Sequence, residues 1–264
     1  MLEIVNAVKT FAAGTPNEMR ALNHLNLSLK DGEFVTVIGS NGAGKSTLFN
    51  AICGNFLLDE GTISLNGEDI TFKEEHRRAR TIGRIFQDPM KGTAPHLTIE
   101  ENLALAYSRS KRGGLNIAVT KKEREMFRKA LSDFGMGLED RMDSQVGLLS
   151  GGQRQVVTLL MATLVPPQLL LLDEHTAALD PATAEKVMDI TQKIIRRDRL
   201  TTLMITHNVN AALNTGSRTI MLDSGSIIFD MGEEERRGMT IEDLMARYSE
   251  KKHTAFDTDR AVFT

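Results

Sequence analysis

The feature that most constrains this chain is the glycine-rich segment 39–46, Gly-Ser-Asn-Gly-Ala-Gly-Lys-Ser, which directly follows the apolar stretch 34–38. It fits the pattern G-x-x-x-x-G-K-[ST], in which the backbone N–H groups of a loop curl toward phosphate oxygens. Residues 45–53 are expected to form a helix whose positive N-terminus faces the same anion. A strand, a phosphate-binding loop and a helix in this order predict an α/β nucleotide-binding domain. By itself the loop suits a GTPase or a small-molecule kinase equally well.

A second motif, residues 169–174, consists of four leucines followed by Asp173 and Glu174. Such an apolar run predicts a central strand of a parallel sheet, and ligands bind at the carboxyl edge of such sheets. Asp173 would then hold the shell of a Mg²⁺ ion through water, and Glu174 would orient or polarise an attacking water. The alternative, two acids that merely end a surface strand, explains neither the buried strand nor the phosphate loop.

A third motif, Ser150-Gly151-Gly152-Gln153, lies between the first two in the sequence. Ser followed three residues later by Gln predicts a capping box at the start of helix 153–165. A glycine-lined, serine-capped helix N-terminus is also an anion site, so the structural and the functional interpretation are compatible.

The remaining pattern alternates strands with helices. Turn signals at Asp31-Gly32, Asn66-Gly67 and Ser224-Gly225 predict three hairpins. Asp180-Pro181 predicts the start of a long helix, with the aspartate as N-cap. Further strands are expected at residues 82–86, 168–172 and 201–206, and further helices from residue 98 and at 121–134.

These elements are expected to form one domain, residues 1–250, with an inserted helical block. The α/β core and its β subdomain take residues 1–88 and 153–250, and the helical subdomain takes residues 89–152. Residues 251–264 are polar and are expected to be a frayed tail. Residues 108–120, which include Arg109, Lys111 and Arg112, are expected to be a mobile, solvated basic loop, with anionic lipid or a partner as the alternative contact.

Composition and charge limit the partners and the location. The formal net charge of −3 gives no strong field for nucleic acid, so no nucleic-acid partner is expected. Cys53, the only cysteine, falls in the helix after the phosphate loop and is expected to be a buried small hydrophobe. The N-terminus does not resemble a signal peptide, and the most apolar segment, residues 159–172, is too short to span a bilayer and contains Pro166-Pro167. The chain is therefore expected in the cytosol.

The three motifs in this order resemble the ATPase subunits of ATP-binding cassette (ABC) transporters, from about Leu2 to about Gly232. The resemblance implies an α/β fold: a P-loop NTPase (RecA-like) core with an antiparallel β subdomain and an inserted α-helical subdomain. It implies ATP hydrolysis with Mg²⁺, in which Glu174 and His207 are catalytic and Lys45 bridges the β- and γ-phosphates. The other residues assigned to ATP are Ser40, Asn41, Gly42, Ala43, Gly44, Ser46 and Thr47, and those assigned to Mg²⁺ are Ser46, Gln87 and Asp173.

The same resemblance implies a homodimer that encloses two MgATP. Ser150, Gly151, Gly152 and Gln153 would contact the nucleotide held by the second copy, and residues 178–180 would touch the opposite subunit. Gln87 would contact Mg²⁺ and the attacking water and link the helical block to the core. Phe11 would take the place of the aromatic that stacks on adenine. The structural alternatives are a core phenylalanine for Phe11 and a structural histidine for His207.

The implied partner is an integral membrane permease, docked at about residues 88–106, with a solute-binding protein in the full system. The chain would then be attached peripherally to the inner face of the cell membrane and would drive an importer of amino acids or a similar small solute. The alternative is a soluble, non-transport ABC ATPase of the cofactor-assembly type. The transported molecule, the direction of transport and the identity of the permease stay open, because they depend on other chains.

One residue departs from the family pattern. His175 stands where proline usually follows the catalytic glutamate. A titrating imidazole beside Glu174 gives the hypothesis that turnover is pH-sensitive. The alternative is an exposed, tolerated substitution.

Overall fold

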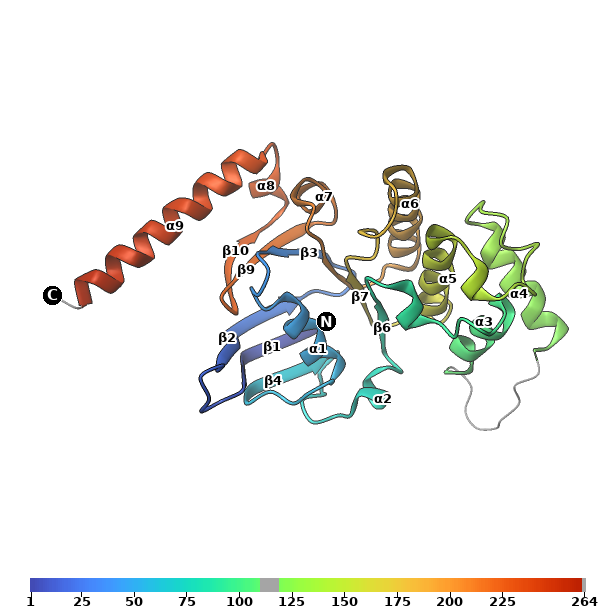
Figure 1. The fold of residues 1–264 in the computed structure, drawn as a ribbon, viewed down its shortest axis with the longest axis horizontal. Coiled ribbons are helices and arrows are strands. Elements are labelled where there is room, and N and C mark those ends of the chain that lie inside the picture. The colour runs from blue at the N-terminus through green and yellow to red at the C-terminus, as the bar shows by residue number, and fades with distance from the viewer. Residues whose placement is uncertain (110–118, 263–264) are drawn as a thin grey trace.

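The computed structural model of this protein describes residues 1–109 and 119–262, with side chains as far as residue 251. Two β-sheets lie side by side, and a helical block extends from one end of the larger sheet (Figure 1). This arrangement is the α/β core with a β subdomain and a helical insert that the sequence predicts.

The larger sheet has the strand order β10-β9-β3-β8-β7-β6. Its strands β3, β6, β7, β8 and β9 run parallel to their neighbours, and β10 pairs antiparallel with β9. The four leucines of β7 are fully buried, as expected for a central parallel strand. The strands are β3 (Phe34–Gly39), β6 (Ile82–Ile85), β7 (Leu169–Asp173), β8 (Thr202–Ile205), β9 (Arg218–Asp223) and β10 (Ser226–Met231).

The smaller sheet is antiparallel, with the order β2-β1-β4-β5. The hairpin predicted at Asn66-Gly67 is confirmed, because Leu65 of β4 pairs with Glu68 of β5. The strands are β1 (Leu2–Phe11), β2 (Met19–Leu29), β4 (Glu60–Leu65) and β5 (Glu68–Asp69), and a short helix α2 (Glu75–Arg78) follows them. The hairpin predicted at Ser224-Gly225 is also confirmed, between β9 and β10.

The hairpin predicted at Asp31-Gly32 is wrong. A turn does form there, since Glu33 N donates to Lys30 O at 3.1 Å, but it joins β2 of the smaller sheet to β3 of the larger one. Strand β3 pairs instead with β8 and β9, which are more than 160 residues away in the chain. Because β3 is buried along its length, it belongs between two parallel strands rather than at the edge of a hairpin.

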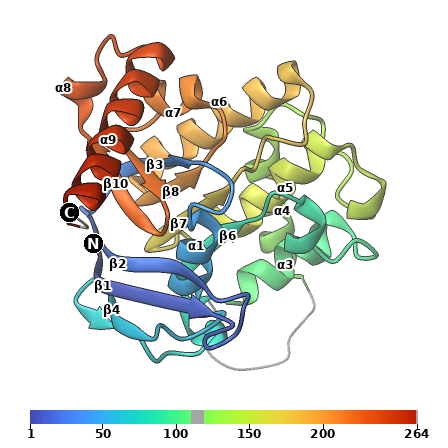
Figure 2. The same ribbon diagram turned by 60° about the vertical axis from the view of Figure 1, so that its left-hand side comes forward.

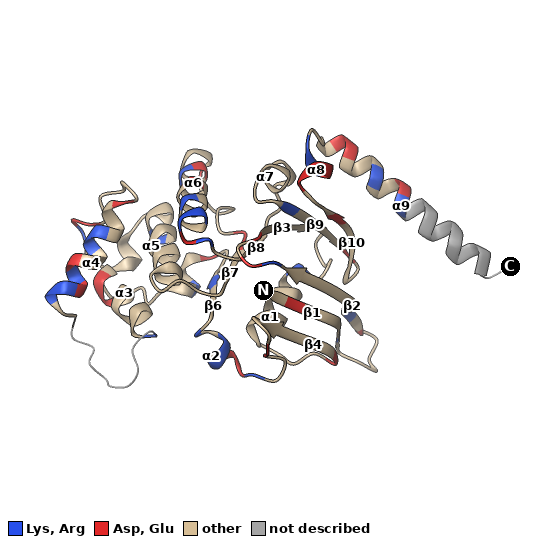
Figure 3. Ribbon diagram, turned by 180° about the vertical axis from the view of Figure 1, so that it is seen from behind, with Lys and Arg blue, Asp and Glu red and all other residues tan. Residues whose placement is uncertain are grey.

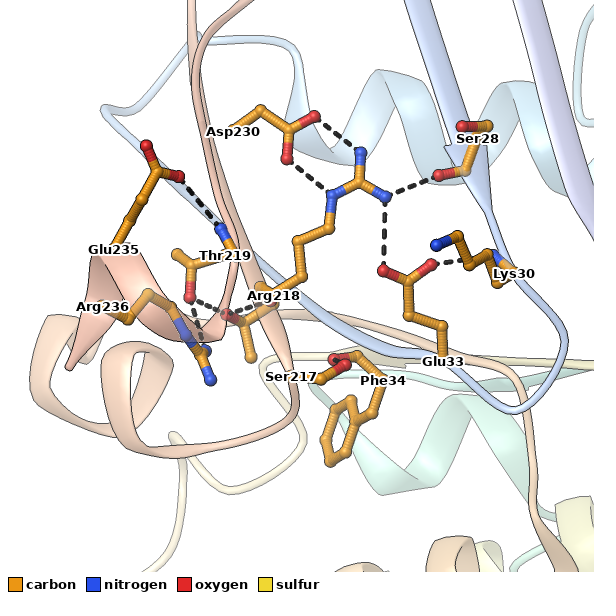
Figure 4. A network of polar contacts seen from close by, with 12 residues as sticks. Ser28, Lys30, Glu33, Phe34, Ser217, Arg218, Thr219, Asp230, Glu235 and Arg236 are labelled. Atoms are coloured by element: carbon orange, nitrogen blue, oxygen red, sulfur yellow. Dashed lines mark hydrogen bonds and ion pairs between the residues drawn. The ribbon is translucent and has the colours of Figure 1, made fainter.

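A network centred on Arg218 ties the two sheets together (Figure 4). The Arg218 guanidinium holds both carboxylate oxygens of Asp230 at 2.6 Å and donates to Ser28 O of β2 at 2.7 Å. It also lies 3.4 Å from Glu33 at the entry to β3. Bidentate arginine–carboxylate pairs fix geometry well, so this network links the two sheets at a defined point.

Helix α1 (Lys45–Cys53) lies between the two sheets (Figures 1 and 2). Its residues Leu48, Phe49 and Ile52 share one hydrophobic core with strands of both sheets. Cys53 is buried there as predicted, and burial raises the pKa of its thiol. The phosphate-binding loop therefore precedes a helix that is packed into the core shared by both sheets.

The helical block contains η1 (Pro89–Gly92), α3 (Ile99–Ser108), α4 (Lys121–Ser132), η2 (Val146–Leu148) and α5 (Gly151–Thr163). Helix starts follow their local signals, since Thr98, Thr120 and Ser150 each form a capping box. The exposed side of α4 mixes acids and bases (Figure 3), and Arg124 of α4 pairs with Glu100 at 2.7 Å and Asp143 at 2.8 Å.

The expected basic loop is described only in part. Arg109 is the C-cap of α3, and it is held in place because its guanidinium donates to Met161 O at 2.8 Å. Lys111 and Arg112 lie outside the described residues.

The C-terminal half of the chain adds α6 (Pro181–Asp198), α7 (Val209–Asn214), α8 (Glu233–Arg236) and α9 (Ile241–Val262). Asp180 caps α6 as predicted. Helix α9 packs through Leu244 against β9 and β10 and then extends away from the body (Figure 1). The fraying expected beyond residue 250 is wrong as far as Val262, because a helix already nucleated on the core gains one hydrogen bond per added residue. Within residues 1–109 and 119–262, we find no helix with the length and apolarity needed to cross a membrane.

Candidate nucleotide-binding site

The loop between β3 and α1 has the geometry of a phosphate cradle. Gly44 precedes α1 with φ of 102°, and a Cβ at this position would lie 2.5 Å from the carbonyl oxygen of Ala21. Only glycine fits there, so the backbone can turn its N–H groups into the loop. The side chain of Lys45 lies across the loop, and its Nζ donates to Gly39 O at 2.7 Å and to Ser40 O at 2.9 Å.

This loop forms the floor of a pocket of about 340 Å³. Most of the residues predicted for ATP line it, together with Gln87, Glu174 and His207 from three other strand ends. Met19 and Ala21 of β2 also line it, although no motif in the sequence pointed to either residue. The loop residues in the lining are Asn41, Gly42, Ala43, Gly44, Lys45, Ser46 and Thr47.

The Lys45 ammonium lies in a partly desolvated, acidic setting. Burial lowers its pKa, and the nearby carboxylates of Glu174 and Asp173 oppose that shift. A cation held close to two acids and to a phosphate-binding loop is suited to a polyanionic ligand.

Glu174 and His207 contact each other across the pocket. Glu174 Oε1 lies 2.5 Å from His207 Nε2, with the glutamate 10% exposed and the histidine 50% exposed. Glu174 has φ of 48°, in the left-handed region, and its N–H donates to Ile205 O at 3.0 Å. Such a conformation costs a non-glycine residue about 1–3 kcal/mol and is frequent at functional sites. It turns Glu174 away from the direction of Asp173 and into the nucleotide pocket.

Asp173 faces another cavity. It lines a neighbouring groove of about 620 Å³ rather than the nucleotide pocket, and its Oδ2 accepts from Arg84 Nη2 at 3.1 Å. Gln87 lines both cavities and so forms the wall between them. Arg84 was not predicted as a site residue, although a charged residue inside the apolar strand 82–86 was a signal.

The serine–glycine motif lies apart from this pocket. Ser150 caps α5 and accepts from Gln153 N at 3.3 Å, so the predicted capping box is confirmed. A Cβ at Gly152 would lie 2.2 Å from Thr183 Cγ2, and therefore glycine is needed where α5 packs on α6. Ser150 and Gly151 are exposed, and none of the four motif residues lines the nucleotide pocket of their own chain.

Phe11 also lies outside the pocket lining. Its ring packs edge-on against Phe56, with ring centroids 5.4 Å apart, and Lys9 Nζ lies 5.7 Å from its centroid. Stacking of Phe11 on adenine stays a prediction, and Met19 is the largest apolar side chain among the residues that line the pocket.

Comparisons with known proteins identify the family. The family model described as ABC transporter matches residues 22–177. A tyrosine transport ATP-binding protein of Clostridioides difficile is 42% identical over 94% of this chain and 98% of that protein. The chain belongs to the ABC transporter family. A xylose/arabinose import ATP-binding protein of Sulfolobus acidocaldarius is a further relative, 33% identical over 94% of this chain and 95% of that protein.

Solved ABC cassettes share the fold. A dimeric ATP-binding cassette in a post-hydrolysis state, bound to ADP and Pi, superimposes with a TM-score of 0.76 at 30% identity, covering 88% of this chain and 99% of that one. A cassette from a Clostridium perfringens transporter complex has a TM-score of 0.75 at 24% identity, covering 93% of each chain. The predicted P-loop fold is confirmed, and the chain is an ABC ATPase that binds ATP.

The donor set of this ABC site suits Mg²⁺. Mg²⁺ prefers hard oxygen ligands and is usually bound through one or two carboxylates together with phosphate oxygens. Ser46 at the start of α1 and Gln87 offer hydroxyl and amide oxygens in the nucleotide pocket, and Asp173 offers a carboxylate in the adjacent groove. Within residues 1–109 and 119–262 we find no cluster of three or more His, Cys, Asp and Glu side chains that could hold a metal alone. Magnesium would therefore be held jointly by the protein and the nucleotide.

His175, the residue that departs from the ABC pattern, is 2% exposed, so the interpretation as an exposed substitution is wrong. Its Nε2 lies 3.1 Å from Thr191 Oγ1. Burial lowers its pKa to about 4. The imidazole is therefore neutral at physiological pH and does not supply the titration that the sequence suggested for turnover.

Proposed function

We propose that this chain binds MgATP as a homodimer and drives an importer of amino acids or a similar small solute through a separate membrane permease. The observation that carries the proposal is the place of Gln87, which lines both the nucleotide pocket and the 620 Å³ groove beside it. A partner seated in that groove would touch the residue that faces the bound nucleotide. Movement at the nucleotide would then reach the partner directly.

The chemistry follows from the side chains around the loop. Lys45 would leave the carbonyls of Gly39 and Ser40 for the β- and γ-phosphates, because phosphate oxygens carry more charge than carbonyls. Glu174 would accept a hydrogen bond from water and orient it toward the γ-phosphorus, and His207 would keep that carboxylate aligned. Bound Mg²⁺ would neutralise charge that develops on the phosphates.

The exposed serine–glycine motif supports the homodimer. The N-terminus of α5, with exposed Ser150 and Gly151, offers free N–H groups to an anion. Since the nucleotide pocket of the same chain does not include this motif, the anion would belong to the second copy. The related cassette that is dimeric and bound to ADP and Pi is consistent with this arrangement.

The position of the groove is consistent with a permease that docks at the N-terminal end of the predicted range 88–106. Its walls include Phe86, Asp88, Pro89 and Lys91, whereas α3 in the same range packs its Ile99 and Leu103 into the core. We therefore place the docking site at residues 86–91 with Asn50, Asn55 and Ala178 opposite. Docking there would attach the chain to the inner face of the cell membrane.

The amino-acid substrate rests on the relative named for tyrosine transport, which matches along nearly its whole length. Relatives named for methionine, pentose, bicarbonate and phosphonate transport match at lower identity. We therefore propose aromatic amino acids as the transported substrates to test first, before other small solutes.

Affinity purification from detergent-solubilised membranes at native expression level tests the partner. We expect a polytopic membrane protein in stoichiometric amount, with recovery reduced by Lys91→Glu in the groove and unchanged by Lys129→Glu on the exposed side of α4. A soluble partner in its place would contradict the transport role. For the substrate, the purified complex in proteoliposomes should show ATP hydrolysis stimulated by L-tyrosine with the cognate binding protein, and stimulation by a pentose instead would exclude the amino-acid assignment.

A further inference from the structure

Arg84 is a largely buried cation in the larger sheet. It belongs to β6, its side chain is 14% exposed, and its guanidinium spans from β7 to α1. Nη2 donates to Asp173 Oδ2 at 3.1 Å, and Nη1 donates to Asn50 Oδ1 at 2.8 Å. The guanidinium also lies over the ring of Phe86, 4.7 Å from its centroid. Arg84 is thus held from three sides.

Arg84 gives the carboxylate of Asp173 a counter-ion that belongs to the chain itself. The guanidinium of Arg84 carries a positive charge, so the carboxylate of Asp173 faces a cation. With Asp173 only 16% exposed, solvent and salt screen the pair much less than a surface pair. Any other cation that binds the Asp173 carboxylate must therefore compete with Arg84.

The pair can open without exposing Arg84. Asn50 holds the other side of the guanidinium, and Asn55 Oδ1 lies 3.3 Å from Nη1. If Asp173 turned toward the nucleotide pocket, these amides and the Phe86 ring would still hold the arginine in the groove. Opening the pair therefore costs one charged hydrogen bond, and the Arg84 guanidinium keeps its other contacts.

We propose that Arg84 is a positioning residue that competes with Mg²⁺ for the carboxylate of Asp173. Arg84 holds Asp173 on the groove side, and the metal site forms only as this ion pair loosens. The inference rests on the proposed magnesium site of Ser46, Gln87 and Asp173. Arg84 also lines the groove assigned to the permease. Its charge there would lose its partner, Asp173, when the metal binds.

The test measures metal affinity directly, with Mn²⁺ as a paramagnetic probe and ADP present, by electron paramagnetic resonance of free Mn²⁺. Arg84→Met keeps the length of the side chain and removes the charge. We expect Mn²⁺ to bind the Arg84→Met complex about tenfold more tightly than the wild-type complex, equivalent to about 1.4 kcal/mol. Arg84→Gln, which keeps polarity at the site, should shift in the same direction and replaces Arg84→Met if that variant does not fold.

Two controls isolate the competition. Arg109→Met removes a guanidinium whose hydrogen bonds go to backbone carbonyls and should leave Mn²⁺ affinity unchanged. In an Asp173→Asn background, Arg84→Met should have no further effect, because the competed carboxylate is gone. Unchanged or weaker Mn²⁺ binding in Arg84→Met with Asp173 intact would overturn the competition.

The outcome also separates this inference from the proposed function. Wild-type protein that binds ADP but no Mn²⁺ would refute the magnesium site itself. Wild-type protein that binds Mn²⁺ with the same affinity as Arg84→Met would refute only the role of Arg84.

Discussion

His175 should make the protein acid-labile in a defined pH window. The imidazole is 2% exposed, and burial lowers its pKa from 6.5 to about 4. Thr191 Oγ1 donates to Val187 O at 2.8 Å, so its only proton is used and it must accept from His175 Nε2–H. The buried form is therefore the neutral imidazole with its proton on Nε2.

The sign and size of the effect follow from linkage. The pKa is lower in the folded than in the unfolded state, so the unfolded chain gains a proton first as the pH falls. The stability present above pH 6.5 is lost progressively toward pH 4. A shift of about 2.5 units corresponds to at most about 3.4 kcal/mol, of which about 2 kcal/mol is lost between about pH 7 and pH 5.

The assay is urea unfolding of the wild type and His175→Gln at a series of pH values from about 7.5 to 5. Glutamine retains an N–H for Thr191 and does not titrate, so its own cost is the same at every pH. We expect the wild type to lose about 2 kcal/mol more than the variant over that range. Parallel curves within about 0.5 kcal/mol would show that His175 is not a buried neutral group. The pH–rate profiles of wild type and His175→Pro should superimpose near neutrality.

Three further outcomes test the site and its packing. Glu174→Gln should bind ATP without hydrolysing it and elute from a sizing column as an ATP-dependent dimer; a monomer with MgATP would contradict the shared site. Lys45→Ala should lose nucleotide binding in equilibrium dialysis, because the ammonium beside the loop is removed, and retained affinity would place the nucleotide elsewhere. Gly152→Ala should lower stability by about 1–3 kcal/mol in thermal unfolding, since its Cβ meets Thr183 Cγ2 at 2.2 Å. Thr183→Ser removes that methyl group and should restore most of the loss; no rescue would exclude this contact as the cause.

The sequence predicted helices well because their starting signals are local. Thr98, Ser150 and Asp180 each cap a helix within three residues of the group they bond. The hairpin turns at Asn66-Gly67 and Ser224-Gly225 are equally local. Each of these features needs only a few neighbouring residues to be decided.

What the sequence could not predict depends on contacts between distant segments. The turn at Asp31-Gly32 has a hairpin composition, yet β3 leaves its sequence neighbour because two distant strands bury it on both sides. His175 resembles a surface residue until α6 brings Thr191 and its core packing over it. Arg84 acquires its role from Asp173, which is 89 residues away.

These errors did not change the predicted position of the candidate site, because that position depends on strand direction more than on strand partners. Asp173 lies level with Ile205 on β8, and Ile205 lies level with Val37 on β3. Parallel strands end at one edge in whatever order they are arranged, so the residues that follow them gather there. Strand order decides the finer chemistry, because β6 is the neighbour of β7 and so places Arg84 beside Asp173. The gathering of the strand-end residues at one pocket could therefore be predicted from the sequence, whereas the contact of Arg84 with Asp173 required the fold.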